Sequence, residues 1–258
     1  DDIRYWIAFH EVEQSLPSRN VAEAERALAA AEAYADPARL GDLPRLEFLK
    51  TKVATLKGDG DRAVVHAARA TAYARELEFP PPAFAVFVVS EAQARLAVGE
   101  TAAALALMRE AAPLAPLAFA DEVRDMIALI EADDAIAAAR EDGRGRLAAA
   151  WARIRERRFY DTFDGYPAFG ARLCALALAH GVEVDFVRSL VEVRGIAPPP
   201  DAPDAWPWPV RIEALGGFTV YRRGEPLVFE GKAEKRPIQL LQVLTALGGG
   251  QFEAAFTL

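Results

Sequence analysis

Small and apolar residues recur along the first part of the chain at helical spacing. Counting from Arg19, Gly58 or Gly99, an apolar or alanine position follows 5, 9 and 12 residues later. Counting from Gly143, the third position fails, and the four starting points are 39, 41 and 44 residues apart. Steps of four and three residues place these positions on one face of an α-helix. They are Ala24, Leu28 and Ala31, then Ala63, Ala67 and Ala70, then Ala104, Met108 and Ala111, and finally Ala148, Ala152 and Arg155.

This spacing predicts helix–turn–helix repeats. Alanine on the shared face lets a paired helix approach closely, and Gly58 and Gly99 suit the left-handed residue that ends a helix. Each hairpin leaves an apolar side that the next hairpin covers, so the array grows as a solenoid. The expected fold is therefore mostly α, a tetratricopeptide-like α-α superhelix over residues 1–196. An irregular bundle of alanine-rich helices is the alternative, because alanine is common enough to match many templates.

Prolines and capping residues mark the ends of the expected helices. The segment "SRNVAEAE" offers Ser18 or Asn20 as an N-cap, with acidic residues in the first turn. The helices are expected over residues 2–16, 20–35, 43–57, 60–76, 83–98, 100–112, 119–139, 142–158, 165–180 and 183–194.

The pattern changes after the last of these helices. Residues 197–209 hold six prolines in thirteen positions, so they are expected to form an extended linker in which Trp206 and Trp208 pack on a neighbouring surface. Beyond it, "VRIEAL", "GGFTVYRR" and "PLVFE" have strand content, with a turn at "RRGE". The segment "EKRPIQLLQVLTAL" predicts an amphipathic helix. Residues 210–258 therefore form a second, different domain.

Charge and composition narrow the range of partners. The formal net charge is −8, and because the residues from Val210 onward carry +1, the preceding part carries −9. An acidic body does not favour the DNA phosphate backbone. No apolar run is long enough for a membrane span, and the acidic start does not resemble a signal peptide. Without an initiator Met, the chain is expected to begin inside a longer polypeptide, and the single Cys174 fits a reducing cytoplasm.

Catalytic and metal-binding patterns are missing from the sequence. No phosphate-binding loop of the Walker type is present, and His10, His66 and His180 lack metal-ligand spacing. We expect His66 to be a structural histidine and Cys174 a small buried residue, while Asp133 and Asp134 are expected to face water. The chain is therefore expected not to be an enzyme, with no catalytic residue, metal or cofactor. The enzyme alternative requires one of the histidines to meet carboxylates in a cleft.

Seven arginines lie between Arg140 and Arg158, against three acidic residues. Arginine suits bidentate capture of carboxylate or phosphate, so the cluster fits an anion-binding or domain-docking surface. The other interpretation is a solvated helix face whose arginines pair with acidic neighbours. Both interpretations stay open from the sequence alone.

The segment "LCALALAHGVEVDFVRSLVEVRGIAPPP" followed by "WPWPVRIEALGGFTVYRRGEPLVFEGKAEKRPIQLLQVLTALGGG" resembles the C-terminal part of MalT-like bacterial transcriptional regulators of the STAND class. The resemblance covers roughly residues 170–250 and is diffuse over the preceding repeats. The matching hairpin positions are Leu215, Gly216, Phe218, Val220, Gly224 and Leu227. The matching positions of the first winged-helix helix are Lys235, Arg236, Pro237, Leu240 and Leu241.

The resemblance implies a sensor region of tetratricopeptide type joined to a winged-helix DNA-binding domain of the bacterial transcriptional activator type. Residues 210–258 would be the truncated N-terminal part of that domain, because "QFEAAFTL" departs from the expected continuation. The family's ATPase module and its DNA-reading helix are then missing, so DNA is a partner of the full-length parent only.

The expected function is that of a sensor and coupling region that binds a small effector or a partner protein on the concave helical-repeat surface. Homo-oligomers are also compatible with such a region. The alternative is a protein–protein interaction scaffold with no small-molecule ligand. The expected contact residues, from repeat geometry, are Tyr73, Phe84, Phe87, Arg153, Arg157 and Tyr160.

Overall fold

The structure, a computed structural model, groups the chain into two compact units, Asp1–Ala205 and Trp206–Leu258. The boundary lies inside the proline-rich stretch. The described residues are 2–16, 18, 20–36, 38–157, 163, 167–214, 217–222, 224–228 and 235–246. Over these ranges the protein is mostly helical, with eleven helices and one small antiparallel sheet.

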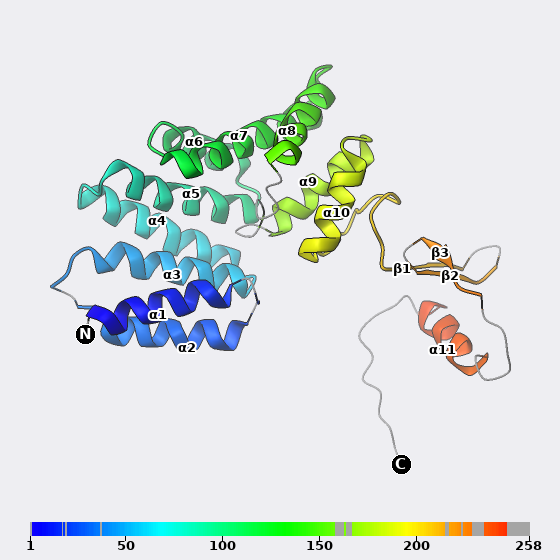
Figure 1. The fold of residues 1–258 in the computed structure, drawn as a ribbon, viewed down its shortest axis with the longest axis horizontal. Helices are drawn as coiled ribbons and strands as arrows, with labels where there is room; N and C mark the ends of the chain where they lie inside the picture. Colours follow the sequence, from blue (N-terminus) through cyan, green and yellow to red (C-terminus); the bar gives the residue numbers. More distant parts are fainter. Residues whose placement is uncertain are drawn as a thin grey trace, which may run out of the picture. The chain divides into compact units, whose positions relative to one another are not determined.

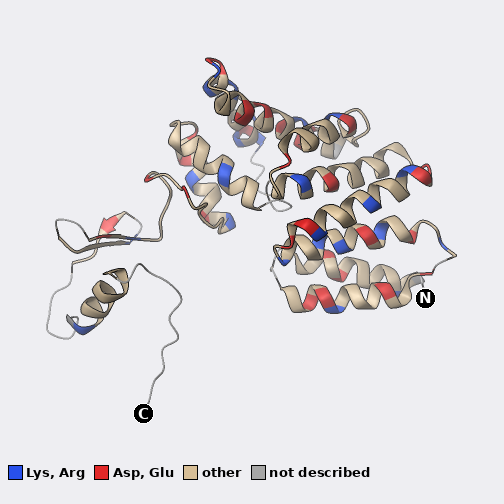
Figure 2. Cartoon of the chain, turned by 180° about the vertical axis from the view of Figure 1, so that it is seen from behind, with Lys and Arg blue, Asp and Glu red and all other residues tan. Residues whose placement is uncertain are grey.

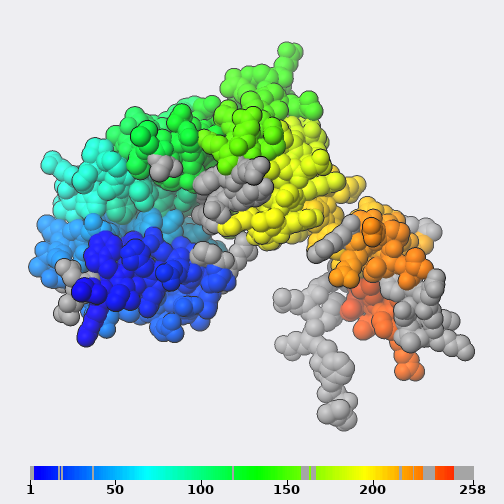
Figure 3. Space-filling view, in the orientation of Figure 1, coloured from blue at the N-terminus to red at the C-terminus, as the bar shows by residue number. Residues whose placement is uncertain are grey.

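The first unit contains ten helices that follow one another as hairpins (Figure 1). They are α1 (Asp2–Ser15), α2 (Val21–Tyr34), α3 (Asp42–Leu56), α4 (Gly60–Glu76), α5 (Pro81–Ala97), α6 (Thr101–Ala111), α7 (Leu117–Ala137), α8 (Gly143–Arg157), α9 (Pro167–Ala179) and α10 (Val184–Arg194). Each odd-numbered helix packs against the next helix in the chain, and α1, α3 and α5 also pack side by side. In the space-filling view of Figure 3, the first three hairpins form one continuous body.

The helix ends have the local chemistry that the sequence predicts. The Asn20 side chain accepts a hydrogen bond from the backbone N–H of Glu23, and Asp59 does the same for Arg62. These caps satisfy N–H groups that have no partner inside the helix. Gly58 ends the third helix at φ +74°, a left-handed conformation that costs glycine little. Helix α5 begins at Pro81 because proline is tolerated in a first turn.

The predicted alanine face is buried in the first three hairpins. Seven of its nine positions there are alanines, and Leu28 is its only partly buried member. The fourth hairpin differs, because α8 buries Leu147, Trp151 and Ile154 instead of the predicted positions. The buried positions lie one residue before the predicted ones, and the residue in the left-handed conformation before α8 is Ala139 at φ 52°, not Gly143. Gly143 is already helical and begins α8.

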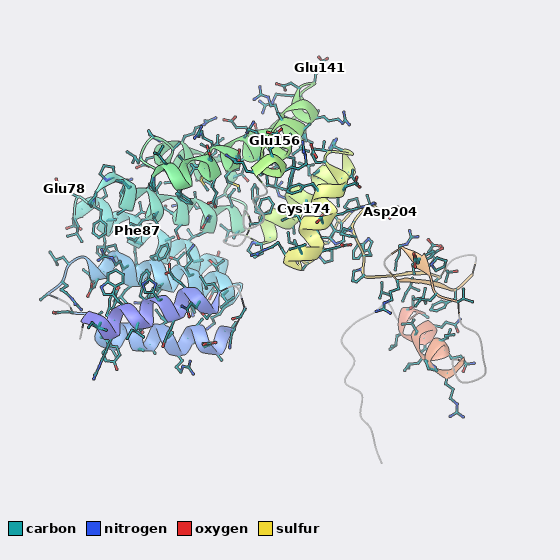
Figure 4. The ribbon with its side chains drawn as sticks, viewed as in Figure 1. Glu78, Phe87, Glu141, Glu156, Cys174 and Asp204 are labelled. Carbon is teal, nitrogen blue, oxygen red and sulfur yellow. The ribbon has the colours of Figure 1, made fainter. Side chains whose placement is uncertain are left out.

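The first two hairpins share a core of small residues and aromatic rings with α5. Phe48 stacks against Phe9 at 6.4 Å between ring centroids and meets Phe87 edge-on at 5.9 Å. Figure 4 labels Phe87 where α5 faces α3. The rings therefore tie one helix from each of three successive hairpins together.

Helix α9 breaks the simple order of neighbours. It packs against α5 and α7 as well as against its own partner α10, and Figure 1 shows its start beside the end of α5. Segments about seventy residues apart in sequence thus become neighbours within the first unit.

The second unit has a three-stranded antiparallel sheet and one helix. The strands β1 (Val210–Glu213), β2 (Thr219–Arg222) and β3 (Glu225–Pro226) lie in the order β1-β2-β3, and α11 (Lys235–Ala246) follows. Ile212 pairs with Val220, and Gly224 takes φ 85° in the predicted turn. Trp206 is buried, and the expected strand positions 229 and 230 lie outside the described residues.

Across the described ranges, none of the helices combines the length and the apolar character that crossing a membrane requires.

Candidate functional site

A cleft lies in the first unit where the turn between α5 and α6 meets the start of α9. Its volume is about 360 Å³, which falls within the range of small-molecule sites. It is lined by Leu96, Ala97, Gly99, Thr101, Ala168, Phe169 and Arg172. Leu96 and Phe169 are buried apolar side chains, so the cleft has an apolar base.

The polar wall of the cleft is an arginine held in a fixed orientation. Arg172 donates from Nη1 to Oδ1 of Asp133 at 2.8 Å and from Nη2 to Oδ2 at 2.6 Å. Its guanidinium carbon lies 5.1 Å from the centroid of the Phe169 ring. The guanidinium has five N–H donors and the Asp133 bonds use two, while the side chain is 46% exposed. Donors therefore stay available to a ligand.

The buried position of Asp133 differs from the prediction that both carboxylates of the Asp133–Asp134 pair face water. Asp133 is buried against Arg172, and only Asp134 is exposed, where it pairs with Arg140. Adjacent helix residues point about 100° apart, so one can turn inward while the other faces solvent.

A second polar feature lies on the face that α1, α3 and α5 share. The Lys52 amine donates to the Gln93 side-chain oxygen at 3.4 Å and lies 5.0 Å from the centroid of the Phe48 ring. Burial lowers the pKa of Lys52, and the charges of Glu13 on α1 and Glu122 on α7 oppose that shift without cancelling it.

Three of the predicted contact residues lie on α4 and α5. Tyr73 is exposed, and Phe84 is partly buried beneath Arg75, whose guanidinium carbon lies 5.3 Å from the ring centroid. Phe87 is 6% exposed and packs against Phe48 and Phe79, so it is part of the core. A surface ligand does not reach Phe87 in this conformation, since the ring is enclosed by its neighbours.

Two further predicted residues lie on α8 and bind a carboxylate of the protein itself. Arg153 Nε lies 3.1 Å from Asp125 Oδ1, and Arg157 contacts the other oxygen of Asp125. Arg157 also lies 3.2 Å from Asp121. Asp125 is buried, so these arginines neutralise an internal charge. The sixth predicted residue, Tyr160, lies outside the described residues.

The other described arginines of the cluster are paired as well. Arg146 pairs with Asp142 and Arg155 with Glu183, while Arg144 donates to the backbone oxygen of His180. Figure 2 shows basic and acidic residues interspersed along the helices of this unit. These contacts favour the interpretation of a solvated helix face with acidic neighbours over that of an anion-binding surface.

The histidines and the cysteine show no catalytic arrangement over the described ranges. His66 Nδ1 lies 2.8 Å from Glu47 across α3 and α4, while His10 pairs with Glu13 on an exposed face. No group of three potential metal ligands comes together among the described residues. Cys174 is buried on α9, as predicted, and burial raises the pKa of its thiol.

Sequence reasoning missed the cleft and the Lys52 environment. Both depend on contacts between different hairpins, which the repeat pattern does not specify. One signal was present in the sequence, the helical i, i+4 spacing that places Phe48 and Lys52 on one face.

Comparison with protein families, curated proteins and solved structures finds no match to this chain.

Proposed function

We propose that the helical unit is the sensor and coupling region of a bacterial transcriptional regulator and that the cleft between α5, α6 and α9 receives a small effector. The cleft carries this proposal, since it combines an apolar base with one oriented arginine. Ligand sites in proteins commonly have this composition, a mostly apolar lining with a few fixed polar groups.

Coupling follows from the position of the cleft between segments far apart in sequence. A ligand that contacts both the α5–α6 turn and α9 stabilises the arrangement in which the two lie together. In our proposal the hairpins form a tetratricopeptide-like superhelix in the cytoplasm, and the ligand changes the population of its conformations. The strand–strand–strand–helix order of the second unit is compatible with the winged-helix resemblance.

The proposal is tested by calorimetric and thermal-shift screening of the full chain with small carboxylates, amides, sugars and nucleotides. A true effector raises the unfolding free energy by about 1.4 kcal/mol at ten times its Kd, because it binds only the folded state.

A matched pair of variants separates the cleft from the rest of the surface. Ala97 is exposed and lines the cleft, so Ala97→Trp fills it and is expected to abolish the response. Ala149 is exposed on α8 outside the cleft, so Ala149→Trp is expected to keep the response. A folded wild-type chain that responds to no compound contradicts the sensor role, and so does a response that Ala97→Trp leaves intact.

The alternative, an interaction scaffold, is favoured by an exposed apolar stripe on α1. Ile3, Trp6 and Ile7 are 75%, 39% and 53% exposed and follow helical spacing. In this alternative a second copy of the chain covers the stripe. Light scattering across a concentration series then shows a dimer that Ile7→Asp dissociates, whereas a monomer at all concentrations contradicts self-association.

A further inference from the structure

Three lysines near one another on the chain have different surroundings. Lys50 lies 3.1 Å from Glu32 and 3.3 Å from Glu47, and Lys57 lies 2.5 Å from Glu25. The Lys52 amine instead meets the neutral side chain of Gln93 at 3.4 Å and the Phe48 ring. Among the described residues, no carboxylate lies within ion-pairing distance of Lys52.

Burial favours the neutral amine at Lys52, while the charges of Glu13 on α1 and Glu122 on α7 favour the charged form. The neutral Gln93 side chain on α5 is the hydrogen-bond partner of the amine. Burial outweighs the attraction of the two carboxylates, so the pKa of Lys52 falls below its usual value of 10.5. For Lys50, burial also lowers the pKa, but the bonds to Glu32 and Glu47 outweigh it and the pKa is raised.

Partial exposure of the side chain and the lack of an ion pair therefore coincide at one lysine. The Lys52 side chain is partly exposed, and its nitrogen makes one long hydrogen bond instead of an ion pair. A desolvated lysine amine without a carboxylate partner is an activated nucleophile.

We propose that Lys52 is a site of covalent acylation by small acyl phosphates. The Lys52 nitrogen attacks the acyl carbonyl carbon and forms an amide bond. The bond between that carbon and the bridging oxygen breaks, and inorganic phosphate leaves with the electron pair. The amine loses one proton to water, so neither oxidant nor reductant is required.

Acylation at this position changes the face that α1, α3 and α5 share. It removes the positive charge between Glu13, Gln93 and Glu122 and ends the cation–π contact with Phe48. The neutral amide suits a half-buried position, whereas acylation of Lys50 breaks two ion pairs. Acylation of Lys52 therefore breaks no ion pair.

The test treats the native full chain with limiting acetyl phosphate at pH 7.5 and measures acetylation of each lysine by peptide mass spectrometry. We expect Lys52 to react at least five times faster than Lys50 and Lys57, which serve as controls within the same chain. In urea the three rates are expected to converge, because the unfolded chain removes the difference in surroundings. Equal or slower reaction of Lys52 in the native chain overturns the proposal.

A substitution of the neighbouring amide provides an independent check. Gln93→Glu puts a carboxylate where Lys52 now meets a neutral oxygen, so the Lys52 rate is expected to fall several-fold. Gln93→Leu keeps the site uncharged and is expected to keep the fast reaction. If both variants, folded by circular dichroism, react like the wild type, the surroundings do not control the amine and the proposal fails.

Discussion

The pair of Arg172 and Asp133 illustrates how one buried charge orders a surface side chain. Asp133 is buried on α7, and its two oxygens hold the guanidinium of Arg172 from α9. A buried carboxylate left without its partner costs more than the roughly 1–3 kcal/mol of an unpaired neutral group, because the desolvation of its charge is no longer compensated. The pair therefore fixes the donor that faces the cleft and joins two hairpins.

A double-mutant cycle with Asp133→Asn and Arg172→Met is expected to show a coupling of about 1–3 kcal/mol in urea unfolding. Arg109 and Glu131 form the matched control, since they also bridge two helices at 2.6 Å but are more exposed. Their coupling is expected to be about 0.5 kcal/mol or less. Equal couplings for the two pairs contradict the structural role of Asp133.

The contribution of Lys52 to the free energy of unfolding is expected to change with pH in the opposite direction to that of an ion-paired lysine. Its folded-state pKa lies below the usual 10.5, so between these two values the unfolded chain binds more protons. The resulting destabilisation is full below the folded pKa and disappears as the pH rises to 10.5. The unfolding free energy of wild type relative to Lys52→Met is therefore expected to rise between pH 7 and 10.5.

Lys50→Met is the control for this measurement. The folded pKa of Lys50 is raised, so its contribution is present below 10.5 and is lost only as the pH rises through the folded value. The wild-type advantage over Lys50→Met is thus expected to stay constant up to about pH 10. If the Lys52→Met difference is flat over the same range, the burial of its amine has no energetic consequence.

At the scale of elements, turns and prolines determine where the helices lie. The predicted helix ranges agree with the structure within about two residues, which is the usual uncertainty of helix ends. In the fourth hairpin the buried positions of α8 lie one residue before the predicted ones, and the left-handed residue before this helix is Ala139, a non-glycine residue. The local sequence does not predict a left-handed conformation at an alanine, since alanine rarely adopts it.

The candidate site was much less predictable than the helices. A phenylalanine on a helix can be an exposed contact residue or a core residue, and the sequence does not separate the two at Phe87. Its contact with Phe48, where α5 approaches α3, shows that it is a core residue. The cleft forms because α9 packs against α5. The spacing of alanines within each hairpin does not predict a contact between helices of two distant hairpins. Arg153 and Arg157 were correctly placed on one helix, but their partner Asp125 comes from another.

Alanine substitutions at two glycines, one in a turn and one in a helix, are expected to change the free energy of unfolding in opposite directions. Gly58 has φ +74°, so Gly58→Ala is expected to destabilise the protein by about 1–2 kcal/mol despite the open space around it. Gly145 lies exposed within α8, so Gly145→Ala is expected to stabilise by about 0.5–1 kcal/mol. Urea unfolding measures both, and a shared sign contradicts the assigned backbone conformations.

At the scale of the whole molecule, the helical unit and the sheet-containing unit differ in how they are held together. The helical unit gains its core from alanine faces and aromatic rings shared by successive hairpins. In the described part of the second unit, Leu240 and Val243 of α11 remain exposed. The helical unit is accordingly where a ligand site of the proposed kind can be preorganised.

The most direct test of the proposed sensor role is a backbone amide NMR titration of the full chain with the compounds that respond in the thermal screen. An effector bound in the cleft is expected to cause saturable shifts that concentrate at residues 96–101 and 168–172 and that Ala97→Trp removes. Saturable shifts confined to other parts of the helical unit, or no saturable shift in a well-folded sample, contradict the sensor role.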